Sequence, residues 1–286
     1  MGGTIVIVVR IWEGLGNQLF QYAYARALEL RTGQKVYLDI SEYEMKPEPV
    51  REYELCHFRI RQPVIHFAKV LPFVNRDKYY AKDMRRLKYF PVGLVKEDDC
   101  YFKQEICELK GLLYIKGWFQ SEKYFKEFTH SIREELYPRN KISISRKLKR
   151  ILEFDNTVSV HIRRGDFKKY RNILSDEYYE RAKKMISRLI GEPYFIIFSD
   201  DIPYVKQNMN FEPRCFYVEP KYLYKDYEEL MIMSRCKHNI IANSTFSWWG
   251  AWLNCNENKI VIAPKKWFPD KLEKDVNIVP DEWLRV

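Results

Sequence analysis

The first forty residues contain the stretch that decides the fold: TIVIVVRIW at 4–12, GLGNQ at 14–18 and LFQYAYARALELR at 19–31. The β-branched run at 4–12 has the length and composition of a strand. The run at 19–31 consists of strong helix formers, and Gly33 is well placed to end that helix. A second strand, KVYLDI, follows at 35–40. This succession predicts a βαβ unit and therefore parallel strands.

Strands and helices also alternate in the rest of the chain. Strands are predicted at 112–118, 157–163, 194–199, 214–218, 239–243 and 259–263, and helices at 121–136, 176–190, 226–234 and 246–253. Such alternation is typical of parallel sheets covered by helices on both faces. Pro138 and the basic stretch that ends at Arg150 form the predicted boundary between two α/β lobes, 1–150 and 151–286.

The composition excludes several classes of protein. Of the 286 residues 46% are hydrophobic and 16% aromatic, which is enough for a buried core and excludes wholesale disorder. The longest apolar run near the start, at 5–9, is too short to span a membrane, so we expect a cytoplasmic protein of bacterial type. The six cysteines form no C-x-x-C pair and no histidine has zinc-finger spacing, so we expect no metal site.

The formal net charge of +10 favours an anionic partner. Two basic clusters, at 76–88 and 146–150, are predicted to be solvated helix faces or, alternatively, a weak peripheral contact with a membrane surface. No pattern of a nucleic-acid-binding module accompanies them, so we expect no nucleic-acid partner. The oligomeric state is not predicted by any pattern in the sequence.

Polar residues gather where two of the predicted strands end, which is where doubly wound sheets bind ligands. The first polar end is HIRRGD at 161–166, and alternation places His161 and Arg163 on the same face of the strand. Arginine at this position suits a diphosphate, because its planar fork of donors matches phosphate oxygens. A buried ion pair between Arg163 and Asp166 is the alternative interpretation.

The second polar end is Asn243-Ser244-Thr245, which leads directly into a helix. Exposed N–H groups, hydroxyls and the helix dipole at such a place bind anions. Simple capping of the helix by Ser244 or Thr245 is the alternative. We expect the three tryptophans of this helix to pack in the core rather than to bind a sugar.

Two further motifs are weaker. The segment 14–18 resembles a dinucleotide-binding glycine loop only loosely, because Leu19 stands in place of the third glycine. Its glycines would allow close approach of a ligand, to which Asn17 would donate. The segment Ser-Asp-Asp at 199–201 is similar to a D-x-D metal site, but its acids are adjacent and point in different directions in an extended chain. We therefore expect no cation there.

Three blocks together resemble glycosyltransferase family 11, the α-1,2-fucosyltransferases: GLGNQLFQYAYARAL at 14–28, HIRRGDF at 161–167 and CKHNIIANSTFSWWGAWL at 236–253. GWFQSEKYF at 117–125 also fits, whereas 41–110 carries no match. The resemblance implies a GT-B-like architecture, in which two Rossmann-like lobes with parallel sheets face each other across a cleft. It also implies that the N-terminal lobe is the acceptor side and that the C-terminal lobe binds the nucleotide sugar.

The H-x-R-R-x-D motif is shared with the protein O-fucosyltransferases and the core α1,6-fucosyltransferases, which use GDP-fucose. This resemblance implies that Arg163 binds the β-phosphate. Arg163 and Asp166 are the expected catalytic residues, Asp166 because it is the nearest carboxylate of the motif. The remaining residues expected to bind GDP-fucose are Gly16, Asn17, His161, Arg164, Glu229, Asn243, Ser244, Thr245 and Ser247.

The implied reaction is an inverting, metal-independent transfer of L-fucose from GDP-fucose to an oligosaccharide acceptor, with O2 of a galactose as the family expectation. Arg163 and the helix start would stabilise the departing GDP in place of a metal ion. Asp166 would accept the acceptor's proton, Glu13 is the alternative base, and a dissociative reaction would need neither. Other interpretations are a transferase of this fold with another linkage or GDP-sugar, a non-catalytic glycan-binding protein, and a basic protein that binds membrane or RNA.

Overall fold

The chain forms two compact units, Met1–Asn140 and Lys141–Val286. The structure is a computed structural model, and it describes residues 6–45, 51–66, 93–97, 101–165, 173–222, 224–268 and 277–286. The described residues form one five-stranded and one six-stranded sheet, in which all neighbouring strands run parallel. The predicted α/β class, with a parallel sheet in each half of the chain, is therefore confirmed.

The division between the units lies at residues 140/141 rather than after residue 150, where the basic stretch ends. The segment between these two positions includes helix α6 (Arg146–Ile151). Its apolar side chains Leu148 and Ile151 are buried in one core cluster with Phe198 and Ile232 of the C-terminal unit. The basic stretch is therefore part of that unit, because the apolar face of its helix is buried in the core.

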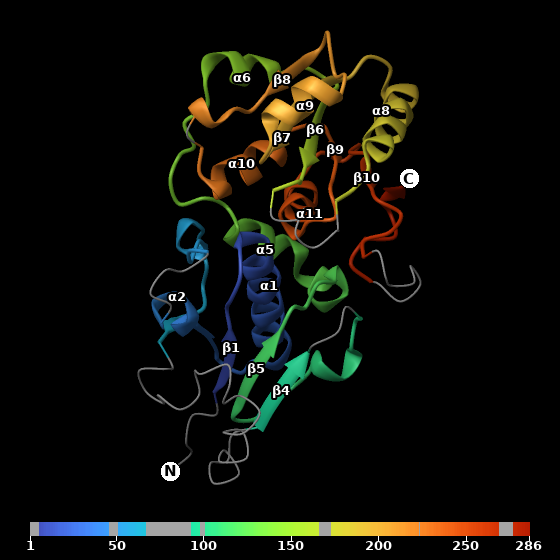
Figure 1. The fold of residues 1–286 in the computed structure, drawn as a ribbon. Coiled ribbons are helices and arrows are strands. Elements are labelled where there is room, and N and C mark those ends of the chain that lie inside the picture. The colour runs from blue at the N-terminus through green and yellow to red at the C-terminus, as the bar shows by residue number, and fades with distance from the viewer. Residues whose placement is uncertain are drawn as a thin grey trace. The chain divides into compact units, whose positions relative to one another are not determined.

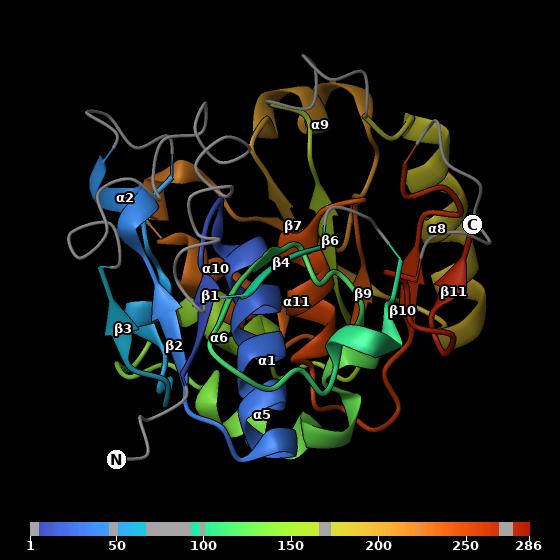
Figure 2. The same ribbon diagram turned by 90° about the horizontal axis from the view of Figure 1, so that it is seen from below.

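The sheet of the N-terminal unit has the strand order β3-β2-β1-β5-β4. Figure 1 labels β1, β5 and β4, and Figure 2 labels β2 and β3. Its strands are β1 (Ile7–Arg10), β2 (Val36–Asp39), β3 (Val64–Ile65), β4 (Gly93–Glu97) and β5 (Leu113–Gly117). Helix α1 (Leu15–Thr32) connects β1 to β2, and ends at Gly33, whose φ of 70° is left-handed as expected for this position. The short helices are α2 (Ser41–Met45), η1 (Leu55–His57) and η3 (Gln104–Ile106).

The helix predicted over 121–136 is broken into three pieces, so this prediction is wrong in its extent. The pieces are η4 (Glu122–Tyr124), η5 (Lys126–Phe128) and α5 (Thr129–Glu135). Ser121 caps only the first piece, with its hydroxyl accepting from the N–H of Lys123. The break lies at Phe125, whose φ of −141° is not helical and whose ring is buried 6.2 Å from the ring of Phe20. Packing of this aromatic residue onto α1 therefore overrides the helical pattern.

The sheet of the C-terminal unit has the order β11-β10-β9-β6-β7-β8 (Figure 2). Its strands are β6 (Thr157–Ile162), β7 (Tyr194–Ser199), β8 (Cys215–Tyr217), β9 (His238–Ile240), β10 (Val261–Ala263) and β11 (Leu284–Arg285). Its other helices are α8 (Asp176–Ile190), α9 (Ile202–Asn208), η6 (Pro220–Tyr222), α10 (Asp226–Met233) and α11 (Thr245–Trp252). The sequence predicted all of these except α9, η6 and β11, which are short.

Both faces of this second sheet are buried, as parallel strands require. Val158, Val160 and Ile162 of β6 pack with apolar residues of α8 and α9 on one face. Ile196 and Phe198 of β7 pack with α6 and α10 on the other face. Trp248 and Trp249 of α11 are fully buried and Trp252 is nearly so, which confirms the prediction that these tryptophans belong to the core.

The strand order reverses once in each sheet. In the N-terminal unit β1 is followed by β2 on one side, whereas β5 lies on its other side. In the C-terminal unit β6 is followed by β7 on one side, whereas β9 lies on its other side. These two places, between β1 and β5 and between β6 and β9, are switch points, and the carboxyl ends of the strands at a switch point are where such sheets bind ligands.

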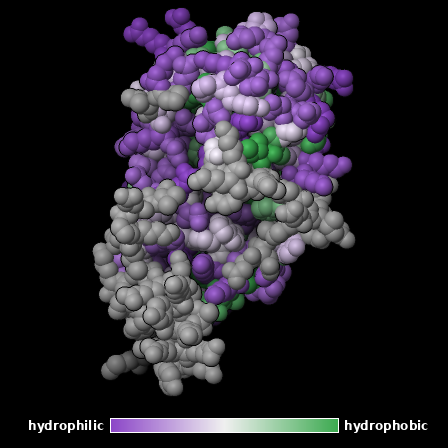
Figure 3. All heavy atoms as spheres, in the orientation of Figure 1, coloured by the Kyte–Doolittle hydropathy of each residue, from purple (hydrophilic) through white to green (hydrophobic). Residues whose placement is uncertain are grey.

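The surface of the C-terminal unit is largely hydrophilic on the face drawn in Figure 3. On α6 the basic residues Arg146, Lys147, Lys149 and Arg150 are exposed while Leu148 is buried. Of the two predicted basic clusters, this one is therefore a solvated helix face, and the cluster at 76–88 lies outside the described residues. None of the described helices combines the length and apolarity needed to cross a bilayer. Contact with a membrane surface stays a prediction.

Candidate functional site

The two polar strand ends predicted from the sequence lie at the same switch point of the C-terminal unit. Val160 of β6 is level with Ile240 of β9, so the segments that follow both strands leave the sheet at one edge. The first of these segments begins with Arg163 and the second leads into α11. The rings of His161 and Phe246 are 5.6 Å apart, which joins the end of β6 to the first turn of α11. The structure thus brings the two halves of the predicted site together.

His161 is a buried, neutral imidazole. It is 6% exposed. His161 is paired with Phe198 of β7, and Phe198 packs on the face of the sheet that α10 covers. Burial, and secondly the positive charge of Arg163, lowers the pKa of His161 to about 3. Its Nδ1 has no hydrogen-bond partner among the described residues. Because buried polar atoms are normally paired, this nitrogen marks a place where a ligand or a water molecule is needed.

Arg163 and the two residues after it are held by Asp200, which follows the neighbouring strand β7. The N–H groups of Arg164 and Gly165 donate to the Asp200 carboxylate at 2.9 and 3.0 Å. The Arg163 guanidinium lies 3.2 Å from the same carboxylate. An ion pair of an arginine with Asp166 was the alternative interpretation of the motif; Asp166 lies outside the described residues, and the acid that the structure shows beside Arg163 is Asp200. A guanidinium has five N–H donors, so this pair leaves Arg163 able to bind phosphate as well.

Gly165 is required for this arrangement. A Cβ atom at this position would lie 2.8 Å from Oδ2 of Asp200, which is closer than real Cβ contacts. The glycine in HIRRGD therefore allows the carboxylate to approach the backbone of the loop.

Arg164 connects three elements instead of facing an open site. Its guanidinium stacks on the ring of Tyr204 at 3.2 Å, and it lies 3.8 Å from both Asp176 and Asp201. Tyr204 also donates a hydrogen bond of 2.9 Å to Asp176. Asp176 begins α8, and Asp201 caps α9 by accepting from the N–H of Tyr204. Arg164 was predicted to bind the donor, which stays a prediction; in the structure it stabilises the loop beside Arg163.

The acids at 199–201 are thus explained by the fold. Asp200 holds the loop after β6, and Asp201 caps α9. Among the residues described, no three side chains of the metal-binding types come together as a cation site would require. The sequence reasoning considered this motif only as a possible metal site and so missed the role of Asp200. The useful signal was an acid that directly follows the strand next to β6.

The start of α11 has unused hydrogen-bonding groups. Ser244 occupies the N-cap position with extended φ and ψ of −130° and 129°, but its side chain makes no capping hydrogen bond. The first helical bond runs from the N–H of Trp248 to the carbonyl of Ser244. Neither hydroxyl of Ser244 and Thr245, both half-buried, bonds to any described residue. Simple capping is therefore not the use of these hydroxyls, which favours the anion-binding interpretation.

The two other predicted residues of this turn have structural roles. Ser247 is 1% exposed, and its hydroxyl is within bonding distance of the carbonyls of Ala242 and Ser244, at 3.4 and 3.2 Å. Asn243 is also buried, and its Nδ2 donates to the carbonyl of Trp267 at 3.2 Å. Both side chains hold the turn from inside, so a ligand would meet Ser244 and Thr245 first.

Glu229 lies in α10, which begins at the carboxyl edge of the sheet because it connects β8 to the parallel strand β9. Burial, and secondly the negative charge of Asp226, raises the pKa of Glu229 to about 7. No hydrogen bond or ion pair joins its carboxylate to the described residues. A half-buried carboxylate without a partner suits a ligand that supplies hydrogen-bond donors.

The predicted residues Gly16 and Asn17 belong to the N-terminal unit. They were expected in a loop, but α1 begins at Leu15, so both lie in its first turn, and the expected glycine loop is wrong. The physical reason is that Gly14 takes the N-cap position, with its carbonyl accepting from the N–H groups of Asn17 and Gln18. Oδ1 of Asn17 accepts a hydrogen bond of 2.9 Å from Gln120. Asp166 lies outside the described residues, so its role as a base stays a prediction.

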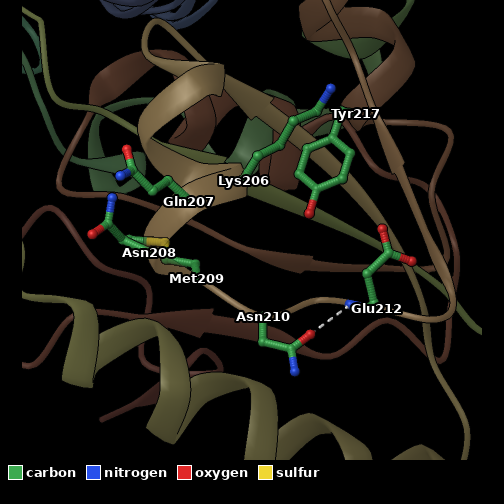
Figure 4. A pocket seen from close by; sticks show the side chains of 7 residues that line it. All are labelled: Lys206, Gln207, Asn208, Met209, Asn210, Glu212 and Tyr217. Atoms are coloured by element: carbon green, nitrogen blue, oxygen red, sulfur yellow. Dashed lines mark hydrogen bonds between the residues drawn. The ribbon is translucent and has the colours of Figure 1, made fainter.

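A separate hollow of about 500 Å³ lies at the outer edge of the second sheet. Figure 4 shows its lining, which comes from the end of α9 and from Tyr217 of the edge strand β8, with Asn210 accepting from the N–H of Glu212. None of the predicted site residues lines it. The switch point between β6 and β9 therefore remains the candidate site of this unit.

Comparison with known proteins shows which family and which solved structures the chain is similar to. The sequence model of Glycosyl transferase family 11 matches residues 6–286. The chain is 32% identical to O-antigen biosynthesis glycosyltransferase WbnK of Escherichia coli, over 96% of this chain and 98% of that protein. It is 29% identical to an alpha-1,2-colitosyltransferase of Escherichia coli, over 98% of this chain and 99% of that protein. Among solved structures, the chain is similar to NodZ alpha-1,6-fucosyltransferase from Bradyrhizobium, co-crystallized with GDP. The TM-score is 0.53 at 14% identity, over 87% of this chain and 92% of that chain. This is a similarity of fold alone.

Proposed function

The chain belongs to glycosyltransferase family 11, and we propose that it transfers L-fucose from GDP-fucose to a hydroxyl of an acceptor glycan, with O2 of a galactose as the acceptor atom. One observation carries the proposal. Arg163 and the unused hydroxyls at the start of α11 follow neighbouring strands at one switch point, where a buried histidine has a ring nitrogen without a partner among the described residues. These groups suit a diphosphate, because a guanidinium and a helix start both bind phosphate oxygens.

The nucleotide would occupy the same edge of the sheet. Glu229 provides an acceptor for the N–H groups of guanine, or for a ribose hydroxyl, and its carboxylate has no partner in the described protein. His161 is neutral, so it can form a hydrogen bond to the diphosphate without bringing a further charge. The family membership and the GDP complex of a protein with a similar fold support a guanine nucleotide as the carrier of the sugar.

The reaction follows from where charge develops. As the bond between fucose and phosphate lengthens, positive charge grows on the sugar ring and negative charge grows on the departing GDP. Arg163 and the helix start of α11 stabilise that negative charge, and they are already in position before the reaction begins. We propose that this replaces a metal ion. Attack of the acceptor hydroxyl on the opposite face of the ring gives inversion at the anomeric carbon.

Two carboxylates are candidates for the base. Asp166 is the nearest carboxylate of the motif in sequence, and Glu13 of the N-terminal unit is the alternative. Both are carboxylates that can accept a proton from the acceptor hydroxyl. A strongly dissociative reaction would place little demand on either, because the acceptor would lose its proton late.

A second donor is favoured by one observation. A relative that is 29% identical over almost the full chain is an alpha-1,2-colitosyltransferase. Colitose is a deoxygenated relative of fucose, so a site for one can accept the other if no side chain depends on the missing hydroxyl. Comparing GDP-fucose with GDP-colitose in the same assay separates the two candidates.

The test is release of GDP from GDP-fucose, with lactose or N-acetyllactosamine as acceptor and EDTA present. We expect acceptor-dependent release in wild type and a reduction of about 10²–10³-fold in Arg163→Ala, the loss typical of removing one such donor. Arg181→Ala, which removes an exposed arginine of α8, is the matched control and should keep full activity. Loss of activity with EDTA would overturn metal independence, and absence of GDP-fucose binding in wild type would overturn the donor.

A further inference from the structure

The switch point of the N-terminal unit lies between β1 and β5, and a tryptophan follows each of these strands. Trp12 comes shortly after β1, and Trp118 directly after β5. Their ring centroids are 4.0 Å apart with an interplanar angle of 46°. Both side chains are half-buried, so the pair keeps part of its aromatic surface at the carboxyl edge of the sheet. This edge is where the topology predicts a ligand, independently of the site in the other unit.

The backbone turns sharply after each of these tryptophans. Glu13 has a φ of 67° and Phe119 a φ of 51°, and no other non-glycine residue in the described ranges has a positive φ. This conformation costs of order 1 kcal/mol for a residue with a side chain and persists only where the surroundings enforce it. The same costly turn thus occurs twice, each time directly after a tryptophan of the pair.

Two buried polar side chains fix these turns. Gln21 is fully buried; it accepts from the N–H of Trp12 at 2.9 Å and donates to the carbonyl of Gly117. Glu97 is 1% exposed and accepts from the N–H groups of Trp118 and Phe119, at 2.7 and 3.1 Å. The indole N–H of Trp12 also donates to the carbonyl of Gly117, at 3.3 Å. The position of the aromatic pair is therefore fixed by the core of the unit.

An exposed carboxylate follows the first tryptophan in the chain. Glu13 directly follows Trp12, and its backbone carbonyl accepts from the Tyr43 hydroxyl and the Gln18 amide, at 2.7 and 2.9 Å. Its own side chain is exposed to solvent. An aromatic surface next to a hydrogen-bond acceptor has the chemistry of carbohydrate recognition, in which a sugar packs its C–H face on a ring and its hydroxyls donate to the acceptor. The Lys116 ammonium lies over the Trp12 ring, 4.7 Å from its centroid, so the aromatic pair has a cation beside it as well as a nearby carboxylate.

We infer that Trp12, Trp118 and Glu13 form the subsite for the acceptor sugar, and that this sugar is a neutral β-galactoside. The inference rests on the proposed function for the identity of the reaction. Galactose has an axial 4-hydroxyl, so its C3, C4 and C5 hydrogens form one apolar face that an indole can cover. The hydroxyls at the rim of the sugar then face the Glu13 carboxylate. In this arrangement the tryptophans position the acceptor, and Glu13 orients one of its hydroxyls.

The inference is tested by saturation-transfer NMR with lactose and no nucleotide, on wild type, Trp118→Leu and Tyr137→Leu. Tyr137 is an exposed aromatic residue of the same unit and serves as the matched control. We expect signals from the galactose ring hydrogens in wild type and in Tyr137→Leu, and their loss in Trp118→Leu. In the GDP-release assay the KM for lactose should rise about tenfold in Trp118→Leu, with the Kd for GDP-fucose unchanged. Trp118→Phe, which keeps an aromatic face, should restore most of the lactose signal.

Equal lactose signals in wild type and Trp118→Leu would overturn the subsite, as would the absence of a signal in wild type. A parallel loss of lactose and GDP-fucose binding in Trp118→Leu would also overturn it, because that result indicates general damage to the fold. Failure of the proposed function has a different signature. Wild type would then show the lactose signal, lost in Trp118→Leu, but would not bind GDP-fucose.

Discussion

The two switch points share one backbone arrangement, in which a carboxylate accepts two N–H groups after a strand, but their side chains suit different ligands. In the C-terminal unit the Asp200 carboxylate accepts two successive N–H groups after β6, and in the N-terminal unit the Glu97 carboxylate does the same after β5. Each carboxylate belongs to the neighbouring strand or to the residue shortly after it. At each place a glycine makes room: a Cβ at Gly165 or at Gly117 would lie 2.8 Å from an atom of the acid's side chain.

The groups that these devices hold are different. After β6 the loop presents Arg163 beside a neutral histidine and a helix start, which suits a diphosphate. After β1 and β5 the chain presents two indoles and an exposed carboxylate, which suit a neutral sugar. The topology thus selects the place where a ligand binds, whereas the residues that follow each strand select the kind of ligand.

Alanine at the two glycines should separate the two switch points most strongly. In Gly117→Ala the new Cβ would lie 2.6 Å from the buried Phe119 ring, so the core must shift, and we expect a loss of about 1–3 kcal/mol in the free energy of unfolding. In Gly165→Ala the obstacle is the end of the Asp200 side chain, which can rotate, so the loss should stay below about 1 kcal/mol. Thermal unfolding followed by circular dichroism measures both.

GDP release, unlike stability, should be reduced by the substitution in the C-terminal unit. Gly165→Ala displaces the carboxylate that holds Arg163, so GDP release should fall although the protein stays folded. Full activity of Gly165→Ala would contradict the role of Asp200 in holding the loop with Arg163. Unchanged stability of Gly117→Ala would contradict the requirement for a glycine beside Glu97 and Phe119.

The two switch points should also differ in how ligand binding depends on pH. Glu229 of the C-terminal unit has a pKa of about 7, so at pH 6 only about one tenth of it is ionised, whereas most of it is ionised at pH 8. If the carboxylate accepts from the N–H groups of guanine, the affinity for GDP should rise about tenfold between these pH values. Calorimetry at pH 6, 7 and 8 measures this rise. Glu229→Gln should bind GDP weakly and with no pH dependence from this group, and lactose binding should be independent of Glu229.

The unliganded protein should respond in the opposite sense. The pKa of Glu229 in the folded state lies above the ordinary value of 4.5, so the folded state binds the proton more tightly than the unfolded state. This contribution to stability is fully present below pH 4.5 and is lost as the pH rises through 7. Stability that falls and GDP affinity that rises over the same interval would identify one group as the cause of both; an identical pH profile in Glu229→Gln would contradict the assignment.

The sequence predicted the long elements well, because their patterns are strong. Helix α8 and strand β7 have the predicted bounds, and the fold class follows from the alternation of strands and helices. The errors lie where packing overrides a local pattern. A single helix was predicted across Phe125, but the burial of its ring against α1 breaks the helix there. Helix α9 was missed because it is short and begins with a cap, Asp201, that had been considered as a metal ligand.

The candidate site was predicted in part. His161, Arg163, Ser244 and Thr245 could be found because strand ends in a parallel sheet are binding positions and because the motifs resemble a family. The role of Asp200 could not, since it depends on β7 lying next to β6. The aromatic pair of Trp12 and Trp118 was missed for the same reason, because more than a hundred residues separate β1 from β5 in the chain although they are adjacent in the sheet.

The most direct test of the central claim is calorimetric titration of GDP into wild type, Arg163→Ala and the control Arg181→Ala. The claim is that the switch point between β6 and β9 binds the diphosphate through Arg163. It predicts binding in wild type and in Arg181→Ala, and a Kd about 10- to 100-fold higher in Arg163→Ala, as expected for the loss of a charged hydrogen-bond donor. Equal affinity in Arg163→Ala and wild type, or no binding of GDP by wild type, would contradict it.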